Sequence, residues 1–461
     1  MADESRGPAT DDALVRELAR HGPTGWERVD AVFAMTVTTE LGHLVYSLGD
    51  RVESMDPPEE IRARVRELRA AAASGAGPWW RMLLVLTNSG VLEVEYDYGE
   101  EPFPPGQLFA PEAYLADLAA FPRARVPVWL AAYTRHQDRQ RRSPKQAAAQ
   151  ARSDRTGGVW ARLAENQFPP FPLMWARWAA LAAAFVAAGS EWGPRMLPWT
   201  GMFEGVARGG ATLYALPGGR AVLSGGVWNA PALDAAYNEA APMPNLYAGA
   251  PDWVADPVLN ARAGSGLLSF CYWWEAGRWY RGESPSAQEC AAALPGIWTG
   301  DTTAEIIAGI AADSGYGEKL PAAKALVTSA ESGAVPVEAL IDVFGTVGEI
   351  DEARYQLTSA GLVPPAPDPL PAEAAITRVR DYITGRGLDT TGYPLSQLVA
   401  RRFSVGWMVY VPVSGEELAI GRAIFYLADD GVLEQSSSSI APARYQADLE
   451  RRFAARQGET G

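Results

Sequence analysis

Three carboxylates alternate along one stretch of the chain, Glu93, Glu95 and Asp97, and two more, Glu100 and Glu101, follow. Alternate side chains of a β-strand point to the same side, so the first three form a row of negative charge on one strand face. Paired carboxylates can do acid–base chemistry, but no His or metal-ligand residue stands near them in sequence, which favours contact with a partner. The row is either an ordinary solvated sheet face or a surface that meets a basic partner.

Other residue types that carry chemistry are few and poorly placed for it. The three histidines, His21, His43 and His136, fit no metal-ligand spacing. Cys271 lies between aromatic residues in an expected strand, which indicates a buried thiol rather than a nucleophile. The chain contains no GxSxG, P-loop or HExxH motif. We therefore expect no catalytic residue, no metal and no cofactor.

A predicted β-hairpin positions the carboxylate row. Residues 81–87 and 91–98 are the expected strands, joined by a turn at Asn88, Ser89 and Gly90. From Met82 to Pro122 the chain has seven acidic residues and no Lys or Arg. We expect Trp79 and Trp80, which precede the hairpin, to be aromatic anchors of the same interface.

Composition narrows the class of partner. The chain has 461 residues, 48% of them hydrophobic, and a net charge of −15. This acidity argues against nucleic acid or an anionic membrane as the main partner and permits a basic protein. The two cysteines, Cys271 and Cys290, indicate no disulfide framework. With no signal-peptide pattern and no apolar run long enough to span a bilayer, we expect a cytoplasmic protein.

The pattern of elements predicts a multidomain α+β chain of small antiparallel sheets flanked by helices, with a helical segment before the last module. Residues 396–402 are expected to form a short helix, followed by a strand over 403–413. The expected parts are an α+β domain over 1–137, a basic linker or solvated helix over 138–155, a Trp-rich α+β domain over 156–300, a helical segment over 301–363, a Pro-rich linker over 364–372 and an α+β module over 373–461.

The Trp-rich middle leaves two other functions open. Trp273, Trp274, Trp279 and Tyr280 could stack a ligand, although such aromatics are more often core residues. The first alternative is an enzyme whose cleft lies around Trp273, Trp274 and Cys271. The second is an adaptor that uses its separate modules for different partners.

Two parts of the chain resemble known families of immunity proteins. Residues 1–137 resemble the YezG-like immunity proteins in the order of four segments: GWERVDAVFAM, WWRMLLVLTNSGVLEVEYDY, PFPPGQLFAPEAYLADLAAFPR and PVWLAAY. Residues 373–456 resemble, more weakly, the YrhB-like immunity protein 35 family in a helix followed by GWMVYVPV, GRAIFYLADDGVLEQSSSS and SIAPARYQADLERRF.

These resemblances imply a cytoplasmic immunity protein of a polymorphic-toxin system that binds a toxin domain and covers its active surface. On that reading Glu93, Glu95 and Asp97, with Glu100 and Glu101, meet Arg and Lys of the toxin. The resemblance does not extend to the middle of the chain, and it implies no oligomeric state for the protein.

Overall fold

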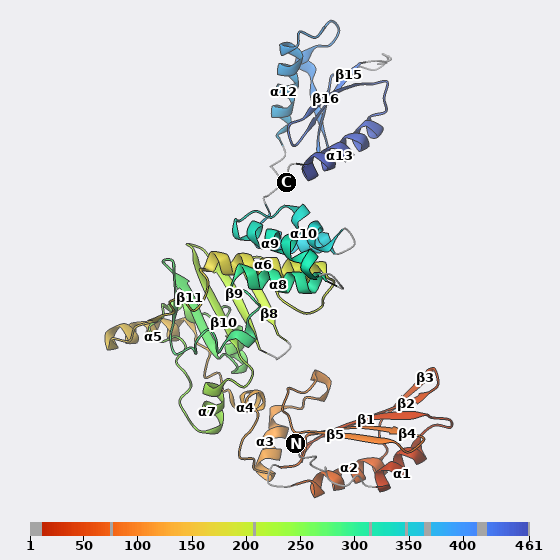
Figure 1. The fold of residues 1–461 in the computed structure, drawn as a ribbon, viewed down its shortest axis with the longest axis vertical. Helices are drawn as coiled ribbons and strands as arrows, with labels where there is room; N and C mark the ends of the chain where they lie inside the picture. The colour runs from red at the N-terminus through yellow and green to blue at the C-terminus, as the bar shows by residue number, and fades with distance from the viewer. Residues whose placement is uncertain are drawn as a thin grey trace. The chain divides into compact units, whose positions relative to one another are not determined.

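The computed structural model describes residues 12–73, 77–205, 209–312, 316–345, 349–363, 370–412 and 422–459, with side chains as far as Phe453 (Figure 1). It confirms the expected fold class, α+β with small antiparallel sheets and flanking helices. The chain forms two compact units, one made of residues 1–171 and 199–295, the other of residues 172–198 and 296–461.

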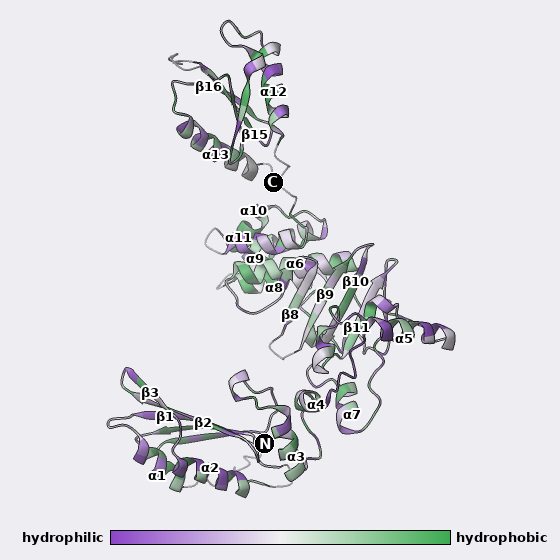
Figure 2. Ribbon diagram, turned by 180° about the vertical axis from the view of Figure 1, so that it is seen from behind, coloured by the Kyte–Doolittle hydropathy of each residue, from purple (hydrophilic) through white to green (hydrophobic). Residues whose placement is uncertain are grey.

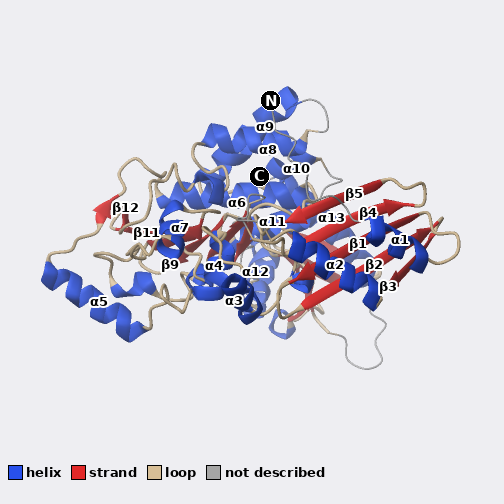
Figure 3. Cartoon of the chain, turned by 90° about the horizontal axis from the view of Figure 1, so that it is seen from below, coloured by secondary structure: helices blue, strands red, loops and turns tan. Residues whose placement is uncertain are grey.

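The first unit begins with an antiparallel sheet of order β3-β2-β1-β4-β5. Its strands are β1 (Arg28–Met35), β2 (Glu40–Leu48), β3 (Arg51–Met55), β4 (Arg81–Thr87) and β5 (Leu92–Asp97). The hairpin β4–β5 confirms the sequence prediction. Figures 1 and 3 show α1 (Asp12–His21) and α2 (Glu59–Ala71) along one side of this sheet.

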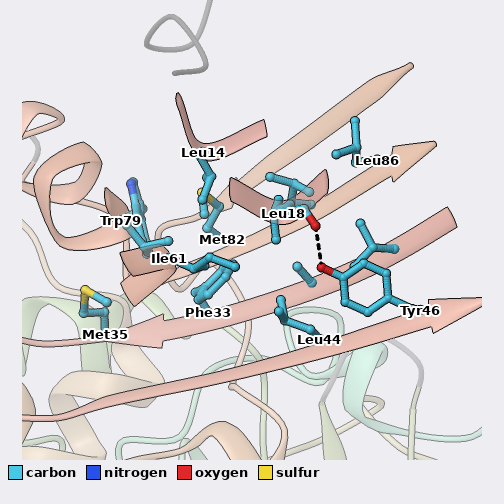
Figure 4. Close-up of a cluster of buried hydrophobic side chains, with 14 residues drawn as sticks. Leu14, Leu18, Phe33, Met35, Leu44, Tyr46, Ile61, Trp79, Met82 and Leu86 are labelled. Carbon is cyan, nitrogen blue, oxygen red and sulfur yellow. Dashed lines mark hydrogen bonds between the residues drawn. The ribbon is translucent and has the colours of Figure 1, made fainter. Parts of the chain in front are cut away.

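The side of the sheet that faces α1 and α2 forms the first core. Leu14 and Leu18 of α1 meet Phe33 of β1 and Tyr46 of β2, and the Tyr46 hydroxyl donates to the Leu18 carbonyl at 2.7 Å (Figure 4). Hydrophilic and hydrophobic residues both occur along α1 and α2 in Figure 2, as expected for helices with one buried face. Burial raises the pKa of Tyr46 to about 12.

A buried ion pair ties α2 to the next helix, α3 (Pro111–Ala120). Arg69 Nη2 donates to both carboxylate oxygens of Asp117 at 2.8 Å, and its Nε donates to the Trp79 carbonyl at 2.9 Å. Asp117 also accepts from Trp80 Nε1 at 2.8 Å and from the Val37 amide at 3.0 Å. One carboxylate thus satisfies donors from three separate elements, which is how a buried charge is tolerated.

A second core joins α3 to α4 (Val128–Arg135) and α7 (Pro231–Asn238). Trp80, Phe103, Tyr114 and Trp129 meet edge to face or stacked, with ring centroids 5.1–6.3 Å apart. The Arg123 guanidinium lies 3.5 Å from the Trp80 ring centre, and burial lowers the pKa of Arg123 to about 10.

The rest of the first unit is built on a second antiparallel sheet. The strands of this sheet that belong to the first unit lie in the order β6-β12-β11-β10-β9-β8. The strands are β6 (Arg162–Leu163), β8 (Thr200–Glu204), β9 (Gly210–Leu216), β10 (Arg220–Gly226), β11 (Phe270–Glu275) and β12 (Arg278–Arg281). Short 3-10 turns at Pro105–Gln107, Asp252–Ala255, Ala261–Ser265 and Ala291–Ala293 complete the unit. One sheet face is covered by residues 246–268 together with Ala147.

The prediction of a linker over residues 138–155 is wrong for most of this stretch. Residues Pro144–Gly157 form α5, whose Ala147, Ala151 and Asp154 are buried. Ser143 caps its start by accepting from the Gln146 amide, and Gly158 ends it in the left-handed conformation. Three of the six basic residues of this stretch, Lys145, Arg152 and Arg155, are exposed on a packed helix, which fits the solvated-helix alternative better than the linker.

The second unit joins a helix from the middle of the chain to the helical segment. Its helices are α6 (Phe171–Ala187), which begins at the unit boundary, and α8 (Gly300–Ala311), α9 (Tyr316–Glu331), α10 (Val337–Phe344) and α11 (Ile350–Ser359), with the short strand β7 (Arg195–Leu197). Arg177 of α6 donates to Glu331 at 2.6 Å and to the Trp298 carbonyl at 2.9 Å. The expected Trp-rich domain over 156–300 is therefore corrected, because its residues 172–198 group with the helices that follow residue 296.

The last part of the second unit is a four-stranded sheet of order β13-β14-β15-β16 with a helix on each face. Its elements are α12 (Ala372–Gly385), a 3-10 turn (Leu395–Gln397), β13 (Val399–Phe403), β14 (Gly406–Tyr410), β15 (Ala423–Ala428), β16 (Leu433–Ser437) and α13 (Pro442–Glu459). The helix expected over 396–402 is wrong, since β13 pairs with β14 there. Most of the expected Pro-rich linker, residues 364–369, lies outside the described residues. Within the described ranges, none of the helices combines the length and apolar character that a membrane crossing requires.

Candidate functional site

The register of the first sheet places Glu93 at the end of a row of four strands. Glu93 stands opposite Val85 of β4, Val85 opposite Asp30 of β1, and Asp30 opposite Val45 of β2. Residues directly opposite one another point to the same side of a sheet. The row therefore holds two carboxylates and two valines on one surface. Arg28, two residues before Asp30 on β1, is exposed on the same side and pairs with Asp30 at 2.5 Å.

Glu95 ends a second row beside the first. It stands opposite Leu83, Leu83 opposite Val32, and Val32 opposite His43. Glu95 and His43 are exposed, while the two aliphatic residues are half-buried by their neighbours on the sheet. We call the surface formed by the two rows the outer face; it comprises Asp30, Val32, His43, Val45, Leu83, Val85, Glu93 and Glu95.

The outer face is the side turned away from the first core. The alternate residues of the same strands, such as Phe33, Tyr46 and Leu84, point into the core against α1 and α2. The outer face therefore combines an aliphatic centre with exposed carboxylates at the edge strand β5. Carboxylates on an edge strand also hinder unwanted pairing with a strand of another chain.

Asp97 lies at one end of this surface but is engaged within the chain. Its carboxylate accepts from Arg81 Nη1 at 2.6 Å and from the Gly99 amide at 2.8 Å. Arg81 is held in turn by Gln107, at 2.7 Å from its Nε. The prediction that Asp97 meets a partner is therefore corrected: its charge is neutralised in a half-buried pair that fixes the end of β5.

Trp79 and Trp80 are the clearest errors of the sequence prediction. Both are completely buried, Trp79 in the first core and Trp80 in the second. Trp80 continues the pairing of β4, since its carbonyl accepts from the Met35 amide and its amide donates to the Asp97 carbonyl. Neither can serve as an interface anchor. The run of apolar residues in β4, RMLLVLT, is the signal that points to the aliphatic residues of the outer face instead.

Glu100 and Glu101 follow β5 in the loop and are both exposed. They extend the acidic character of the region beyond the sheet, but the register does not place them on the outer face. Among the described residues no cluster of His, Cys, Asp and Glu has the grouping of a metal site. His21 and His136 make local contacts, with the Glu17 carbonyl at 3.0 Å and the Asp138 amide at 3.2 Å.

Two of the three residues on which the enzymatic alternative rested, Cys271 and Trp273, are core residues, and the third, Trp274, is half-buried. Cys271 and Trp273 are buried on β11, and Trp273 stacks on Tyr280 with ring centres 6.1 Å apart. Ser284 bonds to both the amide and the carbonyl of Cys271, at 2.9 and 2.8 Å. Burial raises the pKa of the Cys271 thiol well above its ordinary value and that of Cys290 to about 12. These thiols are poorly suited to nucleophilic catalysis.

Thiol labelling tests this description. In the native chain at about pH 9, where a free cysteine with a pKa near 8.5 is mostly thiolate, we expect both thiols to resist 5,5′-dithiobis(2-nitrobenzoate). In denaturant, both should react within the mixing time. Rapid labelling of Cys271 in the native chain would contradict its burial and revive a nucleophilic role.

Comparison with models of known protein families gives no match, and comparison with curated proteins gives none. The likeness of residues 1–137 and 373–456 to immunity proteins therefore stays a prediction from the sequence segments that carry it.

Proposed function

We propose that this chain is an immunity-type protein that binds a basic toxin domain and neutralises it by covering its active surface. The observation that carries the proposal is the outer face, an aliphatic centre bordered by exposed carboxylates on a sheet whose other side forms the core. The resemblance of residues 1–137 to YezG-like immunity proteins supports the same function.

The two kinds of residue on the outer face have different roles in such a complex. When a partner covers the outer face, the apolar surface of Val32, Leu83 and Val85 is removed from water. This burial contributes about 25 cal/mol of binding free energy per Å² of apolar area. Glu93 and Glu95 attract Arg and Lys of the partner, raise the association rate and exclude acidic proteins. An apolar centre with a polar rim is the usual composition of a protein–protein interface.

The charge of the whole chain acts in the same direction. With a net charge of −15, the protein attracts a basic domain from beyond contact distance, and the carboxylates of β5 orient it at close range. Salt screens this attraction with a Debye length of about 8 Å at physiological ionic strength. Binding should therefore weaken as salt rises, while the apolar contribution persists.

The experiment joins capture to a toxicity assay. The full chain is used as bait in lysate of its native cell, at low and high salt, and each captured protein is identified by mass spectrometry. Each captured protein is then expressed alone and with the chain. The proposal expects a basic protein whose expression stops growth and whose effect the chain relieves. If no captured protein stops growth, or the chain fails to relieve the arrest, the proposed function is wrong.

A further inference from the structure

A surface pocket of about 270 Å³ lies beside the C-terminal end of α5, within the first unit. Its lining comes from α5, from the segment that follows it and from the loop before Asp252–Ala255, and includes Asp154, Arg155, Trp160, Pro251 and Asp252. Trp160 is 73% exposed, although an indole of this size is usually buried in a core or an interface. The pocket thus presents an aromatic side chain to solvent next to carboxylates.

The walls of the pocket are held by specific contacts. Asp154 is only 7% exposed, and its carboxylate accepts from the Gly249 amide at 2.8 Å and from Gln150 Nε2 at 3.0 Å. Gly249 has a φ of +69°, and a Cβ there would stand 2.1 Å from the Ala161 amide nitrogen. Only glycine permits this close approach, which sets the backbone that carries Trp160 against the loop.

The charges at the pocket favour a cation. Asp154 and Asp252 contribute two carboxylates, and Arg155 contributes one guanidinium. Asp252 is exposed, and one of its oxygens accepts from the Trp253 amide at 3.0 Å. Arg155 is drawn toward its own helix, because its Nε donates to the Ala151 carbonyl at 3.1 Å. The lining therefore has an excess of one negative charge.

We propose that this pocket binds an arginine side chain of a basic protein segment. A guanidinium is planar, stacks on a single indole face and pairs with a carboxylate through two parallel hydrogen bonds. The lining of the pocket includes both of these groups, one indole from Trp160 and the exposed carboxylate of Asp252.

Other cations fit the pocket less well. A quaternary ammonium is bound by a cage of several aromatic faces, and Trp160 is the one aromatic residue of this lining. A lysine ammonium is compact and strongly hydrated, so it gains less from an open pocket with a single flat wall. The inference does not depend on the proposed function, because the pocket and the outer face are formed by different elements.

The test uses the full chain labelled with 5-fluorotryptophan, in which the Trp160 resonance is identified by its loss in Trp160→Phe. The probes are three blocked tripeptides, Gly-X-Gly, with arginine, lysine or citrulline at the centre. Citrulline keeps the planar shape of arginine without its charge. We expect a saturable shift of the Trp160 resonance with the arginine peptide, at about millimolar affinity, and about tenfold weaker binding of the other two.

Two variants separate charge from shape. Asp252→Asn should weaken the arginine peptide several-fold, and Arg155→Gln should tighten it because a competing cation leaves the pocket. Asp154 is left unchanged because it holds the loop. Equal binding of the arginine and citrulline peptides, or weaker binding by Arg155→Gln, would overturn the proposal. Tighter binding of free agmatine than of the arginine peptide would assign the pocket to a small molecule and also overturn it.

Discussion

Replacing Asp117 with alanine should lower the free energy of unfolding of the N-terminal sheet and its helices by about 3–5 kcal/mol. The side chain is fully buried and accepts from Arg69, Trp80 and the Val37 amide. Its removal leaves the Arg69 guanidinium, itself 5% exposed, without a counter-charge. It also leaves two neutral donors unpaired, and each buried donor without an acceptor costs further free energy.

Native-state hydrogen exchange measures this effect on the full chain. Amides of α2 and β4 should lose about two to four orders of magnitude of protection in Asp117→Ala, while those of β15 in the second unit stay unchanged. Glu67→Ala is the matched control, because Glu67 is also paired with an arginine, Arg64 at 2.6 Å, but is exposed. The control should cost about 0.5 kcal/mol or less. If both variants lost the same free energy of unfolding, burial would not be what determines the contribution of the Asp117–Arg69 pair to stability.

No sequence pattern could have identified Asp117 in this way. In the sequence, Asp117 is one of seven acidic residues in a stretch without Lys or Arg, a pattern that indicates an acidic surface. Its partners lie 48, 37 and 80 residues away in the chain. They meet only when α2, the segment before β4 and the turn after β1 have assembled. Local patterns describe what a residue does within its own element, whereas a buried ion pair depends on tertiary contacts.

The same distinction explains which parts of the site could be predicted. Alternation in β5 correctly placed Glu93 and Glu95 on one exposed side, because the period of a strand is a local property. Trp79 and Trp80 are buried in two cores that include residues from α1, α2, α3 and α4. Their position before the hairpin in the sequence therefore does not predict their burial. Asp97 shares the alternation but pairs with Arg81 across the hairpin.

The prediction of helix or strand was wrong where a short segment had a weak hydrophobic pattern. Residues 396–402 contain Leu398 and Val399, and Phe403 follows directly. The spacing of these three apolar residues is compatible with one helical turn or with a strand. Pairing with β14 decides in favour of the strand β13. The unit boundaries failed for a related reason, since α6 is distant in sequence from the helices with which it is grouped, and Arg177 meets Glu331 across 154 residues.

Charge reversal on the outer face is the substitution with the largest expected effect on the proposed function. Glu93→Lys together with Glu95→Lys should weaken binding of the basic partner by about 100-fold or more, because like charges placed together in an interface cost several kcal/mol. Both residues are exposed, so the free energy of unfolding should change by about 0.5 kcal/mol or less. Asp97 is left in place because its replacement would break the pair with Arg81.

The matched control reverses two exposed glutamates of α2, Glu60 and Glu67, on the helix that packs against the opposite side of the sheet. It changes the net charge by the same amount, so it reproduces the general loss of attraction but not the local one. Calorimetric titration of the captured partner should show a small loss for the control and a large loss for the outer-face variant. If both variants lose affinity equally, net charge alone governs binding. If the outer-face variant binds like the native chain, the partner binds elsewhere. Growth rescue by the same variants then shows whether neutralisation follows affinity, as a mechanism that covers the toxin's active surface requires.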